Sequence, residues 1–352
     1  MNSYERVMTA LRREEPDQVP ILEWAIAPNV IKAIYPGAKD QTDVEETLGL
    51  DAVSILGQFN KLRVKPDGTY MDEWGVWFKP TPEEYDHPVK GPINTMEDLK
   101  SYTPPDPNAP HRLGKLPELV ARFKGKKAIF FRHRAAFMWS VFLNGFENLL
   151  QNFLLDPEFA HKLMDTVLDV SIPIARNAIR AGADAILISD DYAGNDSPFF
   201  SVPVFREFVL PRLKRMVDAV HEEGGIAVKH SDGNLWPLLD LIVETGVDGI
   251  NPMEPIAGMD IGEVKCKYGK KVCLIGNIDC GQLLPHGTEE EVEAAVRECI
   301  HKAAPGGGHI LCSSNSIHSS VKPENYLAMV KAARRYGRYP ISLAEANVVE
   351  KI

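Results

Sequence analysis

The stretch 226–234 joins a short apolar run to residues that could carry out chemistry. The apolar residues 226–228 are followed at once by Lys229-His-Ser-Asp232. In a parallel α/β protein, side chains at the carboxyl end of a buried strand meet the ligand. His230 and Asp232 stand two positions apart and could point to the same side, as metal ligands or as an acid and a base. The alternative is a histidine that only holds a loop by hydrogen bonds.

Four other apolar runs also end in polar residues, which favours a shared site over an isolated pair. These runs are Ile188-Ser-Asp-Asp191, Gly249-Ile-Asn-Pro-Met-Glu254, Leu274-Ile-Gly-Asn-Ile-Asp279 and Ile310-Leu-Cys-Ser-Ser-Asn315. Ionisable groups that gather at one face of a barrel indicate a functional site. The catalytic candidates are His230, Asp232, Asp191 and Asp279. The substrate-binding candidates are Arg132, Glu254, Asn251, Asn315, His318 and Trp24.

Two sets of closely spaced charged residues leave alternatives open. Asp190 and Asp191 point opposite ways on a strand, so at most one faces the site and the other caps a helix or a loop. Arg132 and Arg134 follow another apolar run, where one of them could receive an anionic group of a substrate. An ion pair with one of the aspartates is an equally good interpretation.

The elements that must position these residues alternate between strand and helix. After a helix at 2–14, the expected strands are 19–24, 51–57, 127–132, 184–189, 226–230, 249–251, 271–276 and 309–312. The expected helices are 29–34, 41–48, 115–124, 138–180, 203–223, 235–245, 260–268, 288–303 and 323–336. This alternation predicts an α/β fold, a (β/α)₈ TIM barrel, more economically than a doubly wound sheet. We expect residues 1–352 to form a single domain.

Residues 60–112 interrupt this alternation. The segments 61–64 and 70–78 predict an antiparallel hairpin with Asp67-Gly68 at its turn, and a proline-rich stretch follows from Pro80 to Pro110. We interpret this region as an excursion over the barrel rather than a separate domain. Its aromatic side chains could cap the mouth of the barrel, although packing is the simpler role.

The composition limits the classes of protein to consider. A net charge of −10 argues against non-specific binding to nucleic acid. The sequence contains neither a long apolar run nor a secretory leader, so we expect a cytoplasmic protein without a membrane segment. Five cysteines, none in a CxxC pair, predict free thiols rather than a disulfide framework. Cys312 is the one to note, because it stands at an expected strand end.

Several motifs, in order along nearly the whole chain, resemble the uroporphyrinogen decarboxylase superfamily. They are Glu5-Arg-Val-Met-Thr-Ala-Leu-Arg-Arg-Glu-Glu-Pro-Asp-Gln-Val-Pro20, His230-Ser-Asp-Gly-Asn234, Gly276-Asn-Ile-Asp279, Val321-Lys-Pro-Glu-Asn325 and Ala328-Met-Val-Lys-Ala-Ala333. The resemblance implies a (β/α)₈ barrel. Decarboxylases of this superfamily carry an Arg-Gln-Ala-Gly-Arg-Tyr signature after the first strand, whereas residues 23–32 contain no arginine. A substrate with several carboxylates would find no arginine in this segment to bind them, which disfavours porphyrinogen decarboxylation.

The second branch of the superfamily consists of corrinoid-dependent methyltransferases. Members that methylate thiols bind zinc through His-x-Cys near strand five and a cysteine near strand eight. Here His230 matches the histidine, Asp232 replaces the first cysteine and Asn315 stands where the second is expected, with Cys312 three residues early. The loss of both thiolates implies that the protein does not methylate a thiol. The chain is more similar to methyltransferase I of O-demethylase systems, which moves a methyl group from a methoxylated aromatic to Co(I).

The resemblance also implies cofactors and partners. The expected partners are a corrinoid (cobalamin) carried by a separate corrinoid protein and a small-molecule methyl donor. Zinc could be held by His230 with carboxylates such as Asp191, Glu207 or Asp232. An acid or a metal would assist demethylation by protonating or polarising the ether oxygen. The alternative activity is a decarboxylase for a smaller carboxylated substrate, and the sequence leaves the oligomeric state open, a homodimer included.

Overall fold

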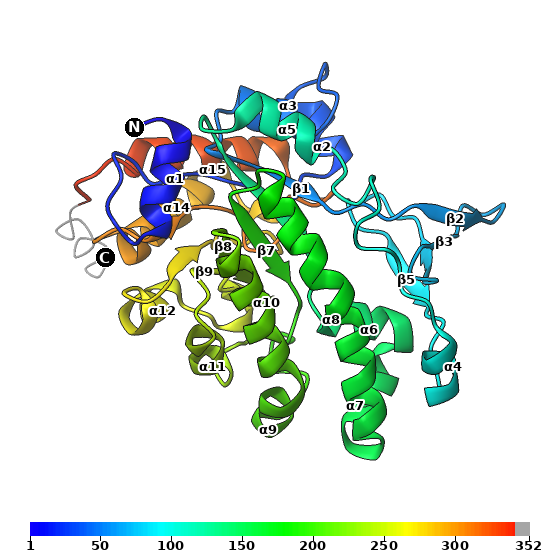
Figure 1. The fold of residues 1–352 in the computed structure, drawn as a ribbon. Helices are drawn as coiled ribbons and strands as arrows, with labels where there is room; N and C mark the ends of the chain where they lie inside the picture. Colours follow the sequence, from blue (N-terminus) through cyan, green and yellow to red (C-terminus); the bar gives the residue numbers. More distant parts are fainter. Residues whose placement is uncertain (342–352) are drawn as a thin grey trace.

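Seven parallel strands form a curled sheet at the centre of the computed structural model, which describes residues 1–341 (Figure 1). Their order in the sheet is the order of the chain, as expected when each strand is joined to the next by a helix on the outside. The strands are β1 (Ala52–Leu56), β6 (Ala128–His133), β7 (Ala185–Ser189), β8 (Ile226–His230), β9 (Gly249–Asn251), β10 (Cys273–Ile275) and β11 (His309–Ile310).

The strand expected at 19–24 is not formed as a regular strand. This segment instead makes one isolated parallel bridge, in which Ile21 pairs with Leu311. On its other side, the backbone N–H of Asp51 donates to the carbonyl of Ile21 at 2.7 Å. Pro20 lacks a backbone N–H and weakens the hydrogen-bond ladder where the strand would begin. The predicted eight-stranded barrel is therefore present in part, as seven strands and an irregular segment that is hydrogen-bonded to the residues just after β11 and just before β1.

Helices surround the sheet, largely where the apolar periodicity predicts them. Local signals set their starts: Pro157 opens α8, and the Asp156 side chain accepts a hydrogen bond from the Phe159 N–H. The helices are α1 (Ser3–Leu11), α2 (Pro28–Ile34), α3 (Gln41–Thr47), α4 (Met96–Ser101), α5 (Leu116–Phe123), α6 (Phe137–Asn144), α7 (Phe146–Leu155), α8 (Pro157–Arg180), α9 (Val202–Val204), α10 (Leu210–Glu222), α11 (Leu239–Glu244), α12 (Ile261–Tyr268), α13 (Leu283–His286), α14 (Glu289–Ala303) and α15 (Pro323–Tyr336). A π-helical turn η1 (Phe205–Val209) and a 3₁₀ turn η2 (Pro255–Ala257) complete the list. Across residues 1–341, none of these helices has both the length and the apolar character to cross a bilayer.

Side chains alternate between two apolar layers along the strands. Phe130 and Leu187 belong to a core enclosed by the curled sheet, whereas Ile129 and Ile186 pack against the outer helices. Helix α1 contributes apolar residues to the enclosed core and contacts β1, β6 and β11. Because the interior is filled with side chains of this kind, the polar residues at the carboxyl ends of the strands remain as the place for a site.

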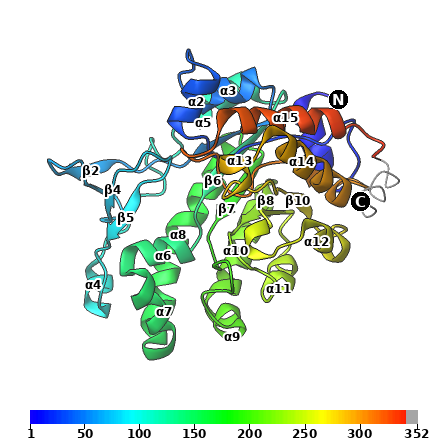
Figure 2. The same ribbon diagram turned by 180° about the vertical axis from the view of Figure 1, so that it is seen from behind.

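Residues 61–90 form a second sheet of four antiparallel strands, which lies to one side of the central sheet (Figures 1 and 2). Its strands are β2 (Lys61–Val64), β3 (Tyr70–Asp72), β4 (Trp77–Lys79) and β5 (His87–Lys90). The expected hairpin is formed by β2 and β3, with Gly68 at a positive φ of 83° in the turn. The proline-rich stretch is more regular than expected, because β5 and α4 lie within it.

Candidate functional site

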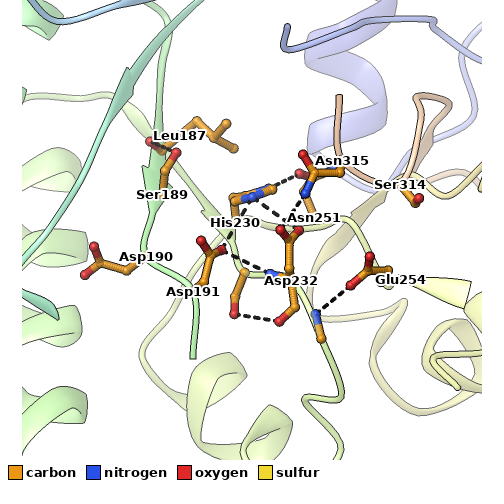
Figure 3. A network of polar contacts seen from close by, with 12 residues as sticks. Leu187, Ser189, Asp190, Asp191, His230, Asp232, Asn251, Glu254, Ser314 and Asn315 are labelled. Carbon is orange, nitrogen blue, oxygen red and sulfur yellow. Dashed lines mark hydrogen bonds and ion pairs between the residues drawn. The ribbon is translucent and has the colours of Figure 1, made fainter. Parts of the chain in front are cut away.

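Three side chains from two strand ends meet at the carboxyl face of the sheet. His230 is the last residue of β8, and Nε2 of its ring lies 3.6 Å from Oδ1 of Asp191 and 3.5 Å from Oδ1 of Asp232 (Figure 3). Asp191 follows β7, which pairs with β8 so that Ser189 lies opposite His230. The catalytic candidates His230, Asp191 and Asp232 therefore form one group, which we call the histidine cluster.

Asn251 orients the imidazole ring of His230 through a contact with its Nδ1 atom. Its Oδ1 lies 2.6 Å from Nδ1 of His230, and its Nδ2 donates to the carbonyl of Ile275 at 2.8 Å. Because an amide oxygen can only accept, Nδ1 of His230 carries the proton and Nε2 presents a lone pair to the two carboxylates. Asn251 is fully buried, so the structure gives this substrate-binding candidate a positioning role instead.

Asp190 and Asp191 divide their roles as the strand geometry predicts. Asp190 points away from His230 and accepts hydrogen bonds from the N–H groups of Phe137 and Met138 at the start of α6 (Figure 3). Burial raises the pKa of Asp190 to about 6, although the charge of Lys229 opposes this shift. Lys229 donates to the carbonyls of Asp190 and His230, which ties the ends of β7 and β8 together.

Asp232 is the buried carboxyl group of the histidine cluster whose pKa is shifted. Burial, reinforced by the neighbouring charges of Asp191 and Glu254, raises its pKa well above the ordinary value. The Asn315 side chain donates to Oδ2 of Asp232, but Oδ1 is buried and has no hydrogen-bond partner among the described residues. Burial likewise lowers the pKa of His230, so the ring is neutral at neutral pH.

Glu254 borders the histidine cluster. Its Oε2 accepts a hydrogen bond from the N–H of Gly233 at 2.9 Å, and this helps to hold the turn after β8. Burial raises the pKa of Glu254, and the charges of Asp191 and Asp279 raise it further. Besides Asn251, Glu254 and Asn315 are therefore the substrate-binding candidates that the structure places at the histidine cluster (Figure 3).

Three other candidates, Asp279, His318 and Trp24, have local structural contacts outside this group. Asp279 accepts hydrogen bonds from the N–H groups of residues 281–283 and so acts as a turn cap. Both ring nitrogens of His318 are within hydrogen-bond distance of backbone groups, at 2.8 Å and 3.3 Å. Trp24 is buried in the core enclosed by the sheet, where its ring packs edge-on against Phe130.

Glu207 is not placed to share a metal with His230. It stands in η1, where its Oε1 lies 3.5 Å from Nε2 of His161 and its side chain is largely exposed. The only group of three possible metal ligands within residues 1–341 is the histidine cluster itself, whose ligand atoms lie within 4.8 Å of one another. The prediction of Glu207 as a ligand was wrong because η1 turns its side chain outward.

Arg132 forms an ion pair, but not with an aspartate. Its guanidinium donates two parallel hydrogen bonds to Glu84, each 2.5 Å long, and a third to the hydroxyl of Tyr85 at 2.8 Å. Glu84 and Tyr85 belong to the segment that joins β4 to β5. Arg132 is thus already neutralised from within the chain, and it attaches the second sheet to the carboxyl end of β6.

Two buried glutamates were missed by the sequence reasoning. Burial raises the pKa of Glu23 to about 7 and that of Glu45 to about 8. Ser313 donates to Glu23 through both its hydroxyl and its N–H, while Gln41 donates to Glu45 at 2.6 Å. Glu23 could have been noticed as the single acid in an apolar run, whereas Glu45 gives no such signal in its helix.

The cysteines are not equipped to act as thiolates at this site. Cys312 is fully buried, and its Sγ lies 3.4 Å from Nδ2 of Asn251, on the far side from His230. Burial raises the pKa of Cys312 well above the ordinary value and that of Cys280 to about 11. All five cysteines are free thiols, as predicted.

A curled parallel sheet with an acidic, histidine-containing cluster at its carboxyl face is typical of enzymes with a barrel-type α/β fold. The chain belongs to the uroporphyrinogen decarboxylase family, because the family model for uroporphyrinogen decarboxylase (URO-D) matches residues 72–336. This finding confirms the family to which the sequence motifs pointed.

Known relatives carry two different activities in their names. The uroporphyrinogen decarboxylase of Thioalkalivibrio sulfidiphilus is 31% identical over 192 residues, which are 52% of this chain and 50% of that protein. That of Pseudoalteromonas atlantica is 24% identical over 258 residues, or 70% of each chain. A methylated-thiol–coenzyme M methyltransferase of Methanosarcina mazei is 27% identical over 252 residues, 70% of this chain and 65% of the relative. The chain thus spans between about half and 70% of the length of these relatives.

A solved structure shares the fold over almost the whole chain. It is a methyltransferase from Methanosarcina mazei, with a TM-score of 0.74 and 20% sequence identity. The match covers 96% of this chain and 99% of the other. At this level of identity the likeness establishes the α/β fold, and the activity has to be argued from the site.

Proposed function

We propose that the protein is a corrinoid-dependent methyltransferase that takes a methyl group from a small methoxylated aromatic compound and transfers it to Co(I). The observation that carries this proposal is the histidine cluster, which offers one neutral imidazole and two carboxylates but no thiolate. Nitrogen and oxygen donors suit the activation of an ether oxygen better than the activation of sulfur. Family membership, with a methyltransferase among the relatives, supports the same reaction class.

The donor set of the histidine cluster fits zinc. Three protein ligands, His230, Asp191 and Asp232, would leave a further coordination position for substrate, as catalytic zinc sites require. The buried, unpartnered Oδ1 of Asp232 is the kind of atom that a cation would satisfy. When bound there, zinc would act as a Lewis acid on the ether oxygen of the methyl donor.

The residues of this chain contribute orientation and a proton. Asn251 holds the imidazole of His230 with Nε2 forward, and Lys229 fixes the two strand ends that carry the ligands. Glu254, whose pKa is raised by burial, can hold a proton for the oxygen that leaves when the methyl group departs. A reduced corrinoid on a partner protein would supply the nucleophile, and this partner would dock over the carboxyl face of the sheet.

A decarboxylase for a smaller carboxylated substrate is the second candidate. It is favoured by the names of two of the relatives described above. Against it stands the absence of arginine from residues 23–32 and the neutralisation of Arg132 by Glu84, which removes another possible carboxylate clamp.

The proposal is tested by incubating the protein with a reduced corrinoid and a panel of methoxybenzoates while the cobalt spectrum is followed. Conversion of Co(I) to methylcobalt that depends on both the donor and His230 would support the proposal. Methylation of a thiol from methylcobalamin, with every methoxy-aromatic inert, would overturn it. Release of carbon dioxide from a carboxylated substrate without any corrinoid would establish the second candidate instead.

A further inference from the structure

A cavity of about 680 Å³ opens beside the carboxyl ends of β1 and β6. The second sheet forms part of its wall, together with residues around α2 and α3 and the start of α6. The volume is within the range that proteins use for small organic ligands. Six of the lining residues are phenylalanine, tyrosine or tryptophan, namely Phe59, Tyr70, Phe78, Tyr85, Trp139 and Phe142.

Most charged groups in the cavity wall are already paired within the chain. Asp40 forms an ion pair with Lys115 at 2.9 Å, and Glu84 neutralises Arg132. Asp86 accepts a hydrogen bond from the hydroxyl of Tyr70 at 2.7 Å. Asp86 also lies 4.0 Å from the ammonium group of Lys61, and none of these acidic side chains forms an ion pair with the remaining arginine of the wall.

Arg134 is that arginine. Its guanidinium lies 5.1 Å from the ring centroids of Tyr85 and Phe142 and 6.0 Å from that of Trp139. It makes no hydrogen bond and no ion pair with any residue between 1 and 341, although it is half-buried. Rings can hold a guanidinium in place, but they leave its N–H donors free for a planar anion.

A second polar group in the same wall also lacks a partner. His133 lines the cavity and is buried, and its Nε2 has no hydrogen-bond partner among the described residues. Buried polar atoms in native proteins are nearly always satisfied, so an orphan atom at a cavity wall indicates a polar ligand. This observation is independent of Arg134.

The cavity and the histidine cluster lie at the carboxyl ends of neighbouring parts of the same sheet. Arg134 directly follows β6, which is separated from His230 on β8 by the single strand β7. Two strand spacings amount to roughly 10 Å, which is comparable with the length of a para-substituted benzoate. A ring held at Arg134 by its carboxylate could therefore direct its other end toward His230.

We propose that this cavity binds an aromatic carboxylate, with Arg134 as the residue that receives the carboxylate and the aromatic wall around the ring. The proposal rests on the proposed function in one respect, because it makes this ligand the methyl donor. Binding itself requires only Arg134 and the cavity. Arg134 is then the residue that selects donors with a ring carboxylate over neutral ones.

The test is a calorimetric titration of the full chain with 4-methoxybenzoate and with its neutral analogue 4-methoxybenzamide. We expect the carboxylate to bind at least tenfold more tightly than the amide. Arg134→Gln should lower the affinity for the carboxylate at least tenfold and leave that for the amide unchanged. Arg206→Gln is the matched control, because Arg206 is exposed on η1 and does not line the cavity.

Three outcomes would overturn the proposal. They are no binding of the carboxylate, equal affinity for both compounds, and an equal loss of affinity for both compounds in Arg134→Gln. The last outcome would show a general effect on the fold, and the thermal midpoint of the variant checks for this. Tight, Arg134-dependent binding without methyl transfer would sustain this proposal while contradicting the proposed function. Equal turnover of carboxylated and neutral donors would support the proposed function while contradicting the role of Arg134.

Discussion

The carboxamide oxygen of Asn251 lies 2.6 Å from Nδ1 of His230, and this contact determines which ring nitrogen is available for chemistry. The amide cannot turn over without losing the hydrogen bond from its Nδ2 to the carbonyl of Ile275. Nε2 of His230 is therefore kept unprotonated and directed at Asp191 and Asp232. A buried amide thus keeps the Nε2 lone pair of His230 available.

Replacing Asn251 should weaken zinc binding without removing a ligand. We expect Asn251→Ala to lower zinc affinity by about 10- to 100-fold, because the partner that fixes a ligating imidazole contributes on this scale. Competition with a chelator of known affinity measures the change. If Asn251→Ala bound zinc as tightly as the wild type while His230→Ala bound none, the orienting role would be disproved.

The identity of the zinc ligands can be checked by elemental analysis of two variants. We expect His230→Ala to lose both zinc and methyl transfer, with a nearly unchanged midpoint of thermal unfolding, because His230 lies at a strand end rather than in the apolar core. Cys312→Ser should retain zinc, since this thiol is buried behind Asn251. Loss of zinc in the cysteine variant alone would show that the ligand assignment is wrong.

Zinc binding should strengthen as the pH rises. Asp232 has a pKa well above its ordinary value, so at mildly acidic pH zinc must displace its proton. We expect the affinity to rise by up to about tenfold per pH unit below that pKa and to level off above it. Titrations in buffers with different ionisation heats count the released protons. In Asp232→Asn the affinity should be lower and this pH dependence should be lost; a wild-type affinity independent of pH would contradict the prediction.

Glu45 should make the fold less stable as the pH rises. Its pKa is about 8 in the folded chain against 4.5 for the free side chain, because burial disfavours the charged form. Between these two values the unfolded chain releases its proton first, so the free energy of unfolding falls with increasing pH. In Glu45→Gln the side chain keeps its length and can still form hydrogen bonds, but it no longer ionises. Urea unfolding at several pH values should therefore show that the free energy of unfolding of the variant rises relative to that of the wild type from about pH 5 to pH 8.

Glu84 should stabilise the attachment of the second sheet. Glu84→Ala would leave the guanidinium of Arg132 buried without its counter-ion, while the glutamate side chain itself is 28% exposed. Since this exposure weakens the pair, we expect a loss of about 2 kcal/mol in the free energy of unfolding, less than for a fully buried pair. Glu97→Ala on the exposed side of α4 is the control. Equal stability of the two variants would show that the ion pair is only a surface contact.

The strand and helix pattern could be predicted because it depends on local chemistry. Apolar runs identified the seven strands of the sheet, and the polar residues that end several of these runs identified the face at which His230, Asp191 and Asp232 meet. The two-residue repeat of a strand was enough to separate the roles of Asp190 and Asp191. The same repeat did not predict the structure at 19–24 correctly. There Pro20 lacks an N–H group, and the segment makes single contacts with two different neighbours in place of a regular strand.

Only the tertiary structure decided which distant groups became partners. Arg132 and Arg134 look alike in the sequence, but Glu84, from the segment between β4 and β5, forms an ion pair with Arg132 and not with Arg134. In the same way, Asn251 became a support for His230 because β9 lies beside β8, and Glu207 was lost to the site because η1 turns it toward His161. The sequence by itself determined which residues stand at the strand ends, since backbone periodicity is local. Burial and pairing depend on contacts between segments far apart in the chain, and these decided which strand-end residues stay free to react.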